Sequence, residues 1–112
     1  MAKLEYTLRG DFDEILRSLE DAVMDGSATA SREDASDFSA AAGRVAVRVY
    51  ERYSWSGSSR VSMNLTLAEL DGRIFLSVIT SGGSQAMYFK VNTWGESAFL
   101  DTIRRAAEAY RA

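Results

Sequence analysis

Residues 44–53 read RVAVRVYERY, and the alternation within this stretch decides the fold. Val45, Val47 and Val49 share one parity, whereas Arg44 and Arg48 belong to the other. A period of two places successive side chains on opposite faces of a β-strand. We therefore predict a long strand that turns its valines toward a core and its arginines toward solvent.

Three further alternating runs follow, at residues 60–68, 73–79 and 87–92. In each run the apolar residues share one parity: Val61, Met63, Leu65 and Leu67, then Ile74, Leu76 and Val78, then Met87, Phe89 and Val91. Two-residue turns at Asp71-Gly72 and Gly82-Gly83 suit hairpins of the primed type. With these turns, residues 44–92 form a four-stranded antiparallel meander with one apolar face.

Directly opposed residues of a hairpin must share a face, so the predicted turns can be checked against the apolar pattern. The Asp71-Gly72 turn pairs Leu67 with Leu76, and the Gly82-Gly83 turn pairs Leu76 with Phe89. The first connection needs an odd number of loop residues, such as 57–59, and then pairs Val49 with Leu67. All three registers place apolar residues opposite apolar residues.

The segments on either side of the meander supply a strand and two helices. Residues 3–9 alternate as a half-buried strand, and Asp11 with Glu14 forms a capping box for a helix that ends at Gly26. Residues 27–43 predict a weak edge strand followed by a loop, although residues 40–43 also suit a short helical turn. A second capping box, Thr93 to Glu96, begins a terminal helix. Its apolar stripe comprises Phe99, Leu100, Ile103, Ala107 and Tyr110.

These elements predict an α+β fold in a single domain, residues 1–112. We expect one antiparallel sheet of five or six strands in the order β-α-β-β-β-β-β-α, with both helices on one face. This order resembles the helix-grip, or TBP-like, class. The segments VRVYERY (47–53), TSGGSQAM (80–87) and WGESAFLDT (94–102) are similar to a family of small uncharacterised bacterial proteins, a domain of unknown function. The resemblance spans the whole chain and implies one domain without implying an activity.

Composition excludes several classes of function. The chain has no His and no Cys, which removes zinc sites, cysteine nucleophiles and Ser-His-Asp triads. No cofactor or metal is expected. A net charge of −3 argues against a nucleic-acid partner. The sequence contains no run of about 18 apolar residues, so no membrane span is predicted. The first residues lack the apolar core of a secretion signal, so we expect a cytoplasmic protein.

The polar parity of the predicted meander collects positive charge around aromatic residues. We expect this face to bind through Arg48, Tyr50, Arg52, Phe75, Tyr88 and Lys90, with Arg44, Arg60 and Arg73 nearby. Arginine and tyrosine are enriched at the centres of interfaces. The face could bind a second copy, another protein or a small anionic ligand. Alternatively, it is merely solvated, or covered by the acidic segment 33–37.

Two smaller features have competing interpretations. A candidate anion site comprises Arg60, Ser62, Ser81, Gly82, Gly83 and Ser84, because backbone N–H groups of Gly-rich turns can bind anions. The same glycines are also what a tight hairpin requires. Glu51 falls on the apolar parity, where it is either a buried acid or turned outward by a bulge.

The leading functional hypothesis is a small non-enzymatic interaction protein that uses the Arg/Tyr face, with a homodimer as one form. The alternative is a carrier that holds an apolar or anionic small molecule between the sheet and the terminal helix. An enzyme that works through Glu51 or the serine cluster is a third hypothesis.

Overall fold

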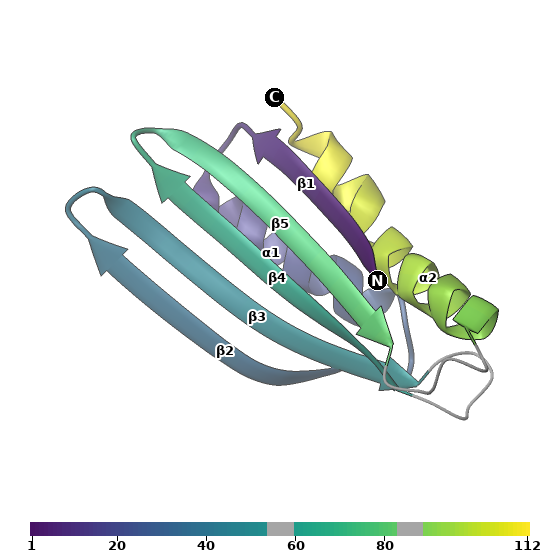
Figure 1. The fold of residues 1–112 in the computed structure, drawn as a ribbon. Helices are drawn as coiled ribbons and strands as arrows, with labels where there is room; N and C mark the ends of the chain where they lie inside the picture. The colour runs from purple at the N-terminus through teal and green to yellow at the C-terminus, as the bar shows by residue number, and fades with distance from the viewer. Residues whose placement is uncertain (54–59, 83–88) are drawn as a thin grey trace.

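The computed structural model describes residues 1–53, 60–82 and 89–112 and has an α+β fold, as predicted (Figure 1). One sheet of five strands is backed by two helices. In chain order the elements are β1 (Ala2–Leu8), α1 (Phe12–Asp25), β2 (Ser31–Ala40), β3 (Gly43–Tyr53), β4 (Arg60–Leu70), β5 (Arg73–Gly82) and α2 (Phe89–Ala109).

The strands lie in the order β1-β5-β4-β3-β2, and every neighbouring pair is antiparallel. A four-stranded meander is present, but it runs from β2 to β5 rather than over residues 44–92. The predicted strand at 87–92 is wrong, because residues 89–92 begin α2. The edge of β5 that this strand was to occupy pairs with β1 instead, where Tyr6 lies opposite Leu76 and Leu8 opposite Ile74. Consequently the predicted pairing of Leu76 with Phe89 does not form.

The β4–β5 hairpin has the predicted turn and register. Asp71 and Gly72 both have positive φ, 52° and 75°, as a primed two-residue turn requires. Leu67 pairs with Leu76 as predicted. Of the predicted Gly82-Gly83 turn, Gly82 ends β5 and Gly83 lies outside the described residues.

The β3–β4 pair has a different register from the predicted one. Val49 lies opposite Asn64 rather than Leu67, a shift of three positions along β4. Because side chains alternate with a period of two, an odd shift exchanges the faces of one strand relative to the other. The predicted turn at 57–59 lies outside the described residues.

Residues 31–40, predicted in part as a loop, form the long edge strand β2. A bulge between Arg32 and Asp34 interrupts its pairing with β3. Beside the bulge, the Ala35 backbone N–H donates to the Asp34 carboxylate at 2.8 Å. A tight turn at residues 41–42 then leads to Gly43, where any Cβ atom would collide with the carbonyl oxygen of Glu69. Glycine is therefore required at the start of β3.

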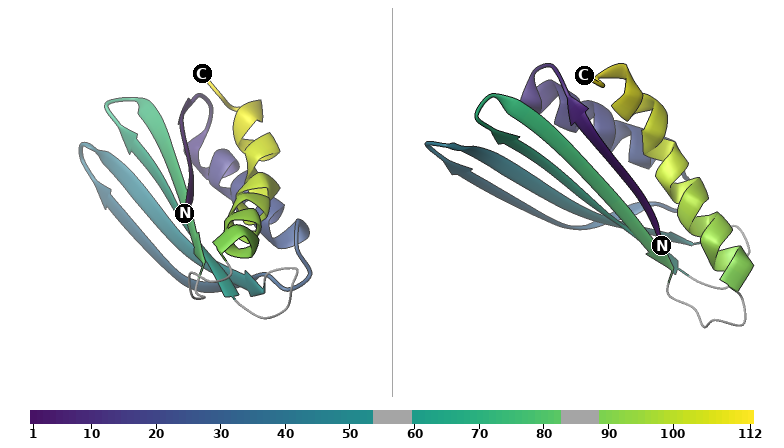
Figure 2. Two further views of the ribbon diagram at one scale, coloured as in Figure 1. Left: turned by 45° about the vertical axis from the view of Figure 1, so that its right-hand side comes forward. Right: turned by 45° about the horizontal axis from the view of Figure 1, so that its top comes forward.

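Both helices cover one face of the sheet, and the two views of Figure 2 show them on the same side. As predicted, α1 is capped by Asp11, which accepts from the Glu14 backbone N–H at 3.0 Å, and by Gly26. The helix α2 begins earlier than the predicted Thr93 box but presents the predicted apolar stripe. The buried side chains come from both helices and from the helix-facing parity of the strands: Leu4, Leu8, Phe12, Ile15, Leu16, Leu19, Val23, Ala46, Tyr50, Val61, Met63, Leu65, Leu67, Ile74, Leu76, Val78, Phe99, Leu100, Ile103 and Ala107.

The end of the chain covers part of the free edge of β1. The Arg9 N–H donates to the Tyr110 carbonyl at 2.8 Å, and the Ala112 N–H donates to the Thr7 carbonyl at 2.9 Å. Neither helix, over its described residues, is long and apolar enough to cross a membrane.

Candidate interaction surface

The sheet has two faces that differ in what covers them. We call the face packed against α1 and α2 the inner face and the opposite one the outer face. In Figure 1 the helices lie behind the sheet, so the outer face is turned toward the viewer. No helix covers the outer face in the described part of the chain.

On β3, Arg48, Tyr50 and Arg52 belong to the inner face, contrary to the prediction. Arg48 and Tyr50 are buried, with 7% and 0% of their surface exposed, and Arg52 shares their parity. Val45, Val47 and Val49 point to the outer face. The alternation of this strand was predicted correctly, but its orientation was wrong.

Arg48 is accommodated on the inner face by two carboxylates. Its Nε atom donates to Glu20 of α1 at 2.7 Å, and its guanidinium lies 3.2 Å from Asp37 of β2. Burial alone would lower the pKa of Arg48, but the hydrogen bonds to Glu20 and Asp37 raise it above its ordinary value. Arg32 also reaches Glu20, at 3.5 Å. The result is a structural ion-pair network that ties α1 to β2 and β3.

Tyr50 and Arg52 are less completely hydrogen-bonded than Arg48. The Tyr50 hydroxyl and the Arg52 Nε atom are buried with no hydrogen-bond partner among the described residues. Burial raises the pKa of Tyr50 to about 12, and the charge of Glu20 adds to this shift. The Arg52 guanidinium lies over the Phe99 ring of α2, 4.7 Å from its centre, and burial lowers the pKa of Arg52.

The remaining residues of the predicted binding face do not share a surface with Arg48, Tyr50 and Arg52. Phe75 lies on the outer face and is exposed. Lys90 belongs to α2 rather than to a strand, and Tyr88 lies outside the described residues. The predicted set is therefore not one surface, because the shifted β3 register and the start of α2 separate its members.

The candidate anion site is assembled only in part. Ser62 and Ser81 are cross-strand partners whose hydroxyl oxygens lie 3.0 Å apart. The Gly82 N–H is occupied, since it donates to the buried carboxylate of Glu96. Arg60 is paired with Glu51 at 2.6 Å and Glu33 at 3.7 Å. Gly83 and Ser84 lie outside the described residues.

Glu51 points to the outer face, so it is not the buried acid that the sequence allowed. No bulge turns it there, because the β3–β4 pairing is continuous from Gly43 to Tyr53. Its carboxylate binds Arg60 and is partly exposed. Among the described residues, no three Asp or Glu side chains come together as metal ligands would.

Apolar side chains dominate one end of the outer face. Cross-strand partners form a continuous row from β2 to β5, in which Phe38 pairs with Val45, Val45 with Ala68, and Ala68 with Phe75. Leu70 lies beside this row at the turn end of β4. We call these five residues, Phe38, Val45, Ala68, Leu70 and Phe75, the outer apolar patch. Phe38 is 68% exposed, Leu70 53% and Phe75 44%, so the patch meets solvent.

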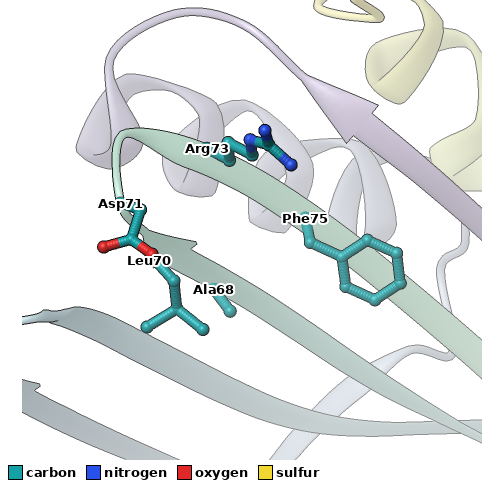
Figure 3. A pocket seen from close by; sticks show the side chains of 5 residues that line it. All are labelled: Ala68, Leu70, Asp71, Arg73 and Phe75. Atoms are coloured by element: carbon teal, nitrogen blue, oxygen red, sulfur yellow. The ribbon is translucent and has the colours of Figure 1, made fainter.

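The patch contains a shallow groove, which Figure 3 shows from close by. Ala68, Leu70, Asp71, Arg73 and Phe75 line it, at the end where β4 turns into β5. Leu70 and Phe75 project to the same side of the sheet, away from the helices. Contiguous exposed apolar side chains with a polar rim are typical of interaction sites on soluble proteins.

Sequence reasoning missed most of the patch for two reasons. Phe38 lies in the segment predicted as a loop, and Val45 was assigned to the core. Residues 34–40 have no alternating apolar pattern that indicates this pairing, because Asp34 and Ser36 share the parity of Phe38. Phe75 was assigned correctly to the outer face.

The fold defines the class of this chain: a small α+β protein with one sheet face covered by helices and one that no helix of the described residues covers. Residues 1–111 match the protein-family model described as "Family of unknown function (DUF6054)". The chain belongs to this family. No curated protein and no solved structure matches the chain. The likeness to the helix-grip class therefore remains a prediction from element order.

Proposed function

We propose that this chain is a non-enzymatic, cytoplasmic interaction protein whose binding surface is the outer face of the sheet. The observation that carries the proposal is the outer apolar patch. Phenylalanine and leucine side chains at 44–68% exposure lie contiguously on a face that has no helix over it in the described residues. Burying such a patch gains roughly 25 cal/mol per Å² of apolar surface.

The test uses the absence of cysteine from the chain. Ala68→Cys places a single thiol in the middle of the patch, and Ala98→Cys places one on the exposed side of α2 as a matched control. The measurement is the ratio of the two alkylation rates, first in dilute purified protein and then inside cells that produce the protein at its native level.

If the outer face is occupied in cells, the alkylation rate of Ala68→Cys falls relative to that of Ala98→Cys by about tenfold or more, since an occupied interface core excludes reagent and water. An unchanged ratio would contradict the proposal. The readout depends only on whether the face is covered, not on the identity of the partner.

The carrier alternative has one supporting observation. The Tyr50 hydroxyl and the Arg52 Nε atom are buried on the inner face without partners among the described residues, and the Arg52 guanidinium lies over Phe99 of α2. Such groups could bind a small anion. The outer face is the stronger candidate, because it rests on several contiguous residues.

A further inference from the structure

We infer that the outer face is occupied by a second copy of the same chain, packed sheet against sheet around a two-fold axis. This inference rests on the proposed function and names the partner. It follows from the size, the twist and the charge of the outer face.

The outer face has the area that a stable dimer needs. Five strands at about 4.8 Å spacing and about ten residues at 3.3 Å rise give a face on the order of 800 Å². A stable interface of ordinary size buries about 800 Å² on each partner. A peptide laid across the patch would cover only a fraction of this face.

The shape of the face favours another sheet as its occupant. Sheets twist with a fixed hand, and two sheets pack face to face when their twists match, with strand directions within about 30°. A second copy has the same twist by construction. Closed two-fold dimers are also the commonest form of homo-oligomer.

The charges of the outer face neither repel a copy nor favour a strongly charged partner. Among the described residues, the strands carry three cations and four acids on this face: Lys3, Arg60 and Arg73, with Glu5, Glu33, Asp34 and Glu51. Asp71 of the β4–β5 turn adds a fifth acid, where it lines the groove beside Arg73. Lys3 pairs with Glu5 at 3.9 Å, and Arg60 with Glu51. Most of these charges lie away from the outer apolar patch, as rim residues of an interface do.

The test is the mass of the purified protein by sedimentation from about 0.1 to about 100 μM, a range in which an interface of this size associates. We expect the mass to rise from 12.3 kDa to twice that value. Phe38→Lys and Phe75→Lys should each weaken dimerisation at least tenfold. Met24→Lys is the control, because Met24 is exposed to a similar degree but lies on α1.

Alkylation of Ala68→Cys locates the interface in the same samples. The thiol should become protected over the same concentrations at which the mass doubles, whereas the thiol of Ala98→Cys should stay reactive. Circular dichroism checks that each lysine variant is folded.

Two results would overturn the inference: a monomer at about 100 μM, or a dimer that neither lysine variant weakens. A monomer in which the thiol of Ala68→Cys is nevertheless protected in cells would leave the proposed function standing with a different protein as partner. A monomer in which this thiol is reactive in cells as well would remove both.

Discussion

The two faces of β3 differ in a way that reverses the usual expectation. Arg48 and Tyr50 are buried on the inner face, whereas Val45 and Val47 point to the uncovered outer face. The inner arginine is tolerated because Glu20 and Asp37 meet it there. Charge alone therefore does not decide which side of a strand is inside. The partners that other elements supply decide it.

The largest expected effect on the free energy of unfolding comes from Leu76→Ala on the inner face of β5, compared with Phe75→Ala on its outer face. Leu76 is fully buried and Phe75 is 44% exposed, although they are neighbours in sequence. Leu76→Ala should lower the free energy of unfolding by about 3 kcal/mol, through lost burial and a cavity. Phe75→Ala should cost less than about 1 kcal/mol in the monomer.

Urea unfolding at low protein concentration measures both variants. Similar costs for the two would break the distinction between the faces. Repeating the comparison at high concentration sharpens it, because a dimer would make Phe75→Ala more costly while leaving the Leu76→Ala cost unchanged.

The next effect is an alkaline loss of stability that belongs to Tyr50. Its pKa in the folded protein is about 12, against about 10 for an exposed tyrosine. Because this pKa is raised, the contribution of Tyr50 to the free energy of unfolding is complete below pH 10. It is lost as pH rises from 10 to 12, since in this range the tyrosine ionises only in the unfolded chain. The loss should reach about 2 to 3 kcal/mol.

The matched variant is Tyr50→Phe, which removes the hydroxyl and keeps the ring. Between pH 10 and 12, the free energy of unfolding of this variant should fall by about 2 to 3 kcal/mol less than that of the parent. Unfolding at a series of pH values measures both. Near neutral pH it should be as stable as the parent or more stable by up to about 1 kcal/mol, since the hydroxyl has no partner among the described residues. A destabilised variant would show that the hydroxyl is bonded after all.

The smallest of the three effects compares two arginines. Arg48→Met should cost about 2 kcal/mol, because it leaves the Glu20 and Asp37 carboxylates without their buried partner. The cost is moderated because Glu20 keeps Arg32. Arg73→Met, on the exposed turn end of the outer face, should stay within about 0.5 kcal/mol at low concentration. Equal costs in urea unfolding would mean that the Arg48 network contributes nothing.

Local patterns predicted much of the fold correctly. The Asp11 and Gly26 caps placed α1, the Asp71-Gly72 turn fixed the register of β4 with β5, and the apolar stripe of α2 was read from its helical spacing. Each of these features depends on neighbours in sequence. That is why a single sequence was sufficient for them.

The errors concern contacts between distant segments. Residues 87–91 alternate well enough for a strand, but β1 occupies the edge that this strand would need. The face of β3 depends on Glu20, which is 28 residues from Arg48. The candidate surface was consequently predicted on the wrong side of β3, while Phe75 was placed correctly because its own hairpin was correct.

The edge strand β2 bears on how large an assembly of this protein can grow. Its bulge breaks the ladder, and the Ala35 backbone N–H beside the bulge already donates to the Asp34 carboxylate, so it is not free for an incoming strand. At the opposite edge, residues 110–112 block one end of β1. Strand-by-strand polymerisation into fibres is thus disfavoured at both edges. The two-fold association that we propose through the outer face would, by contrast, be complete after two molecules, and apolar side chains could then be exposed without forming open-ended polymers.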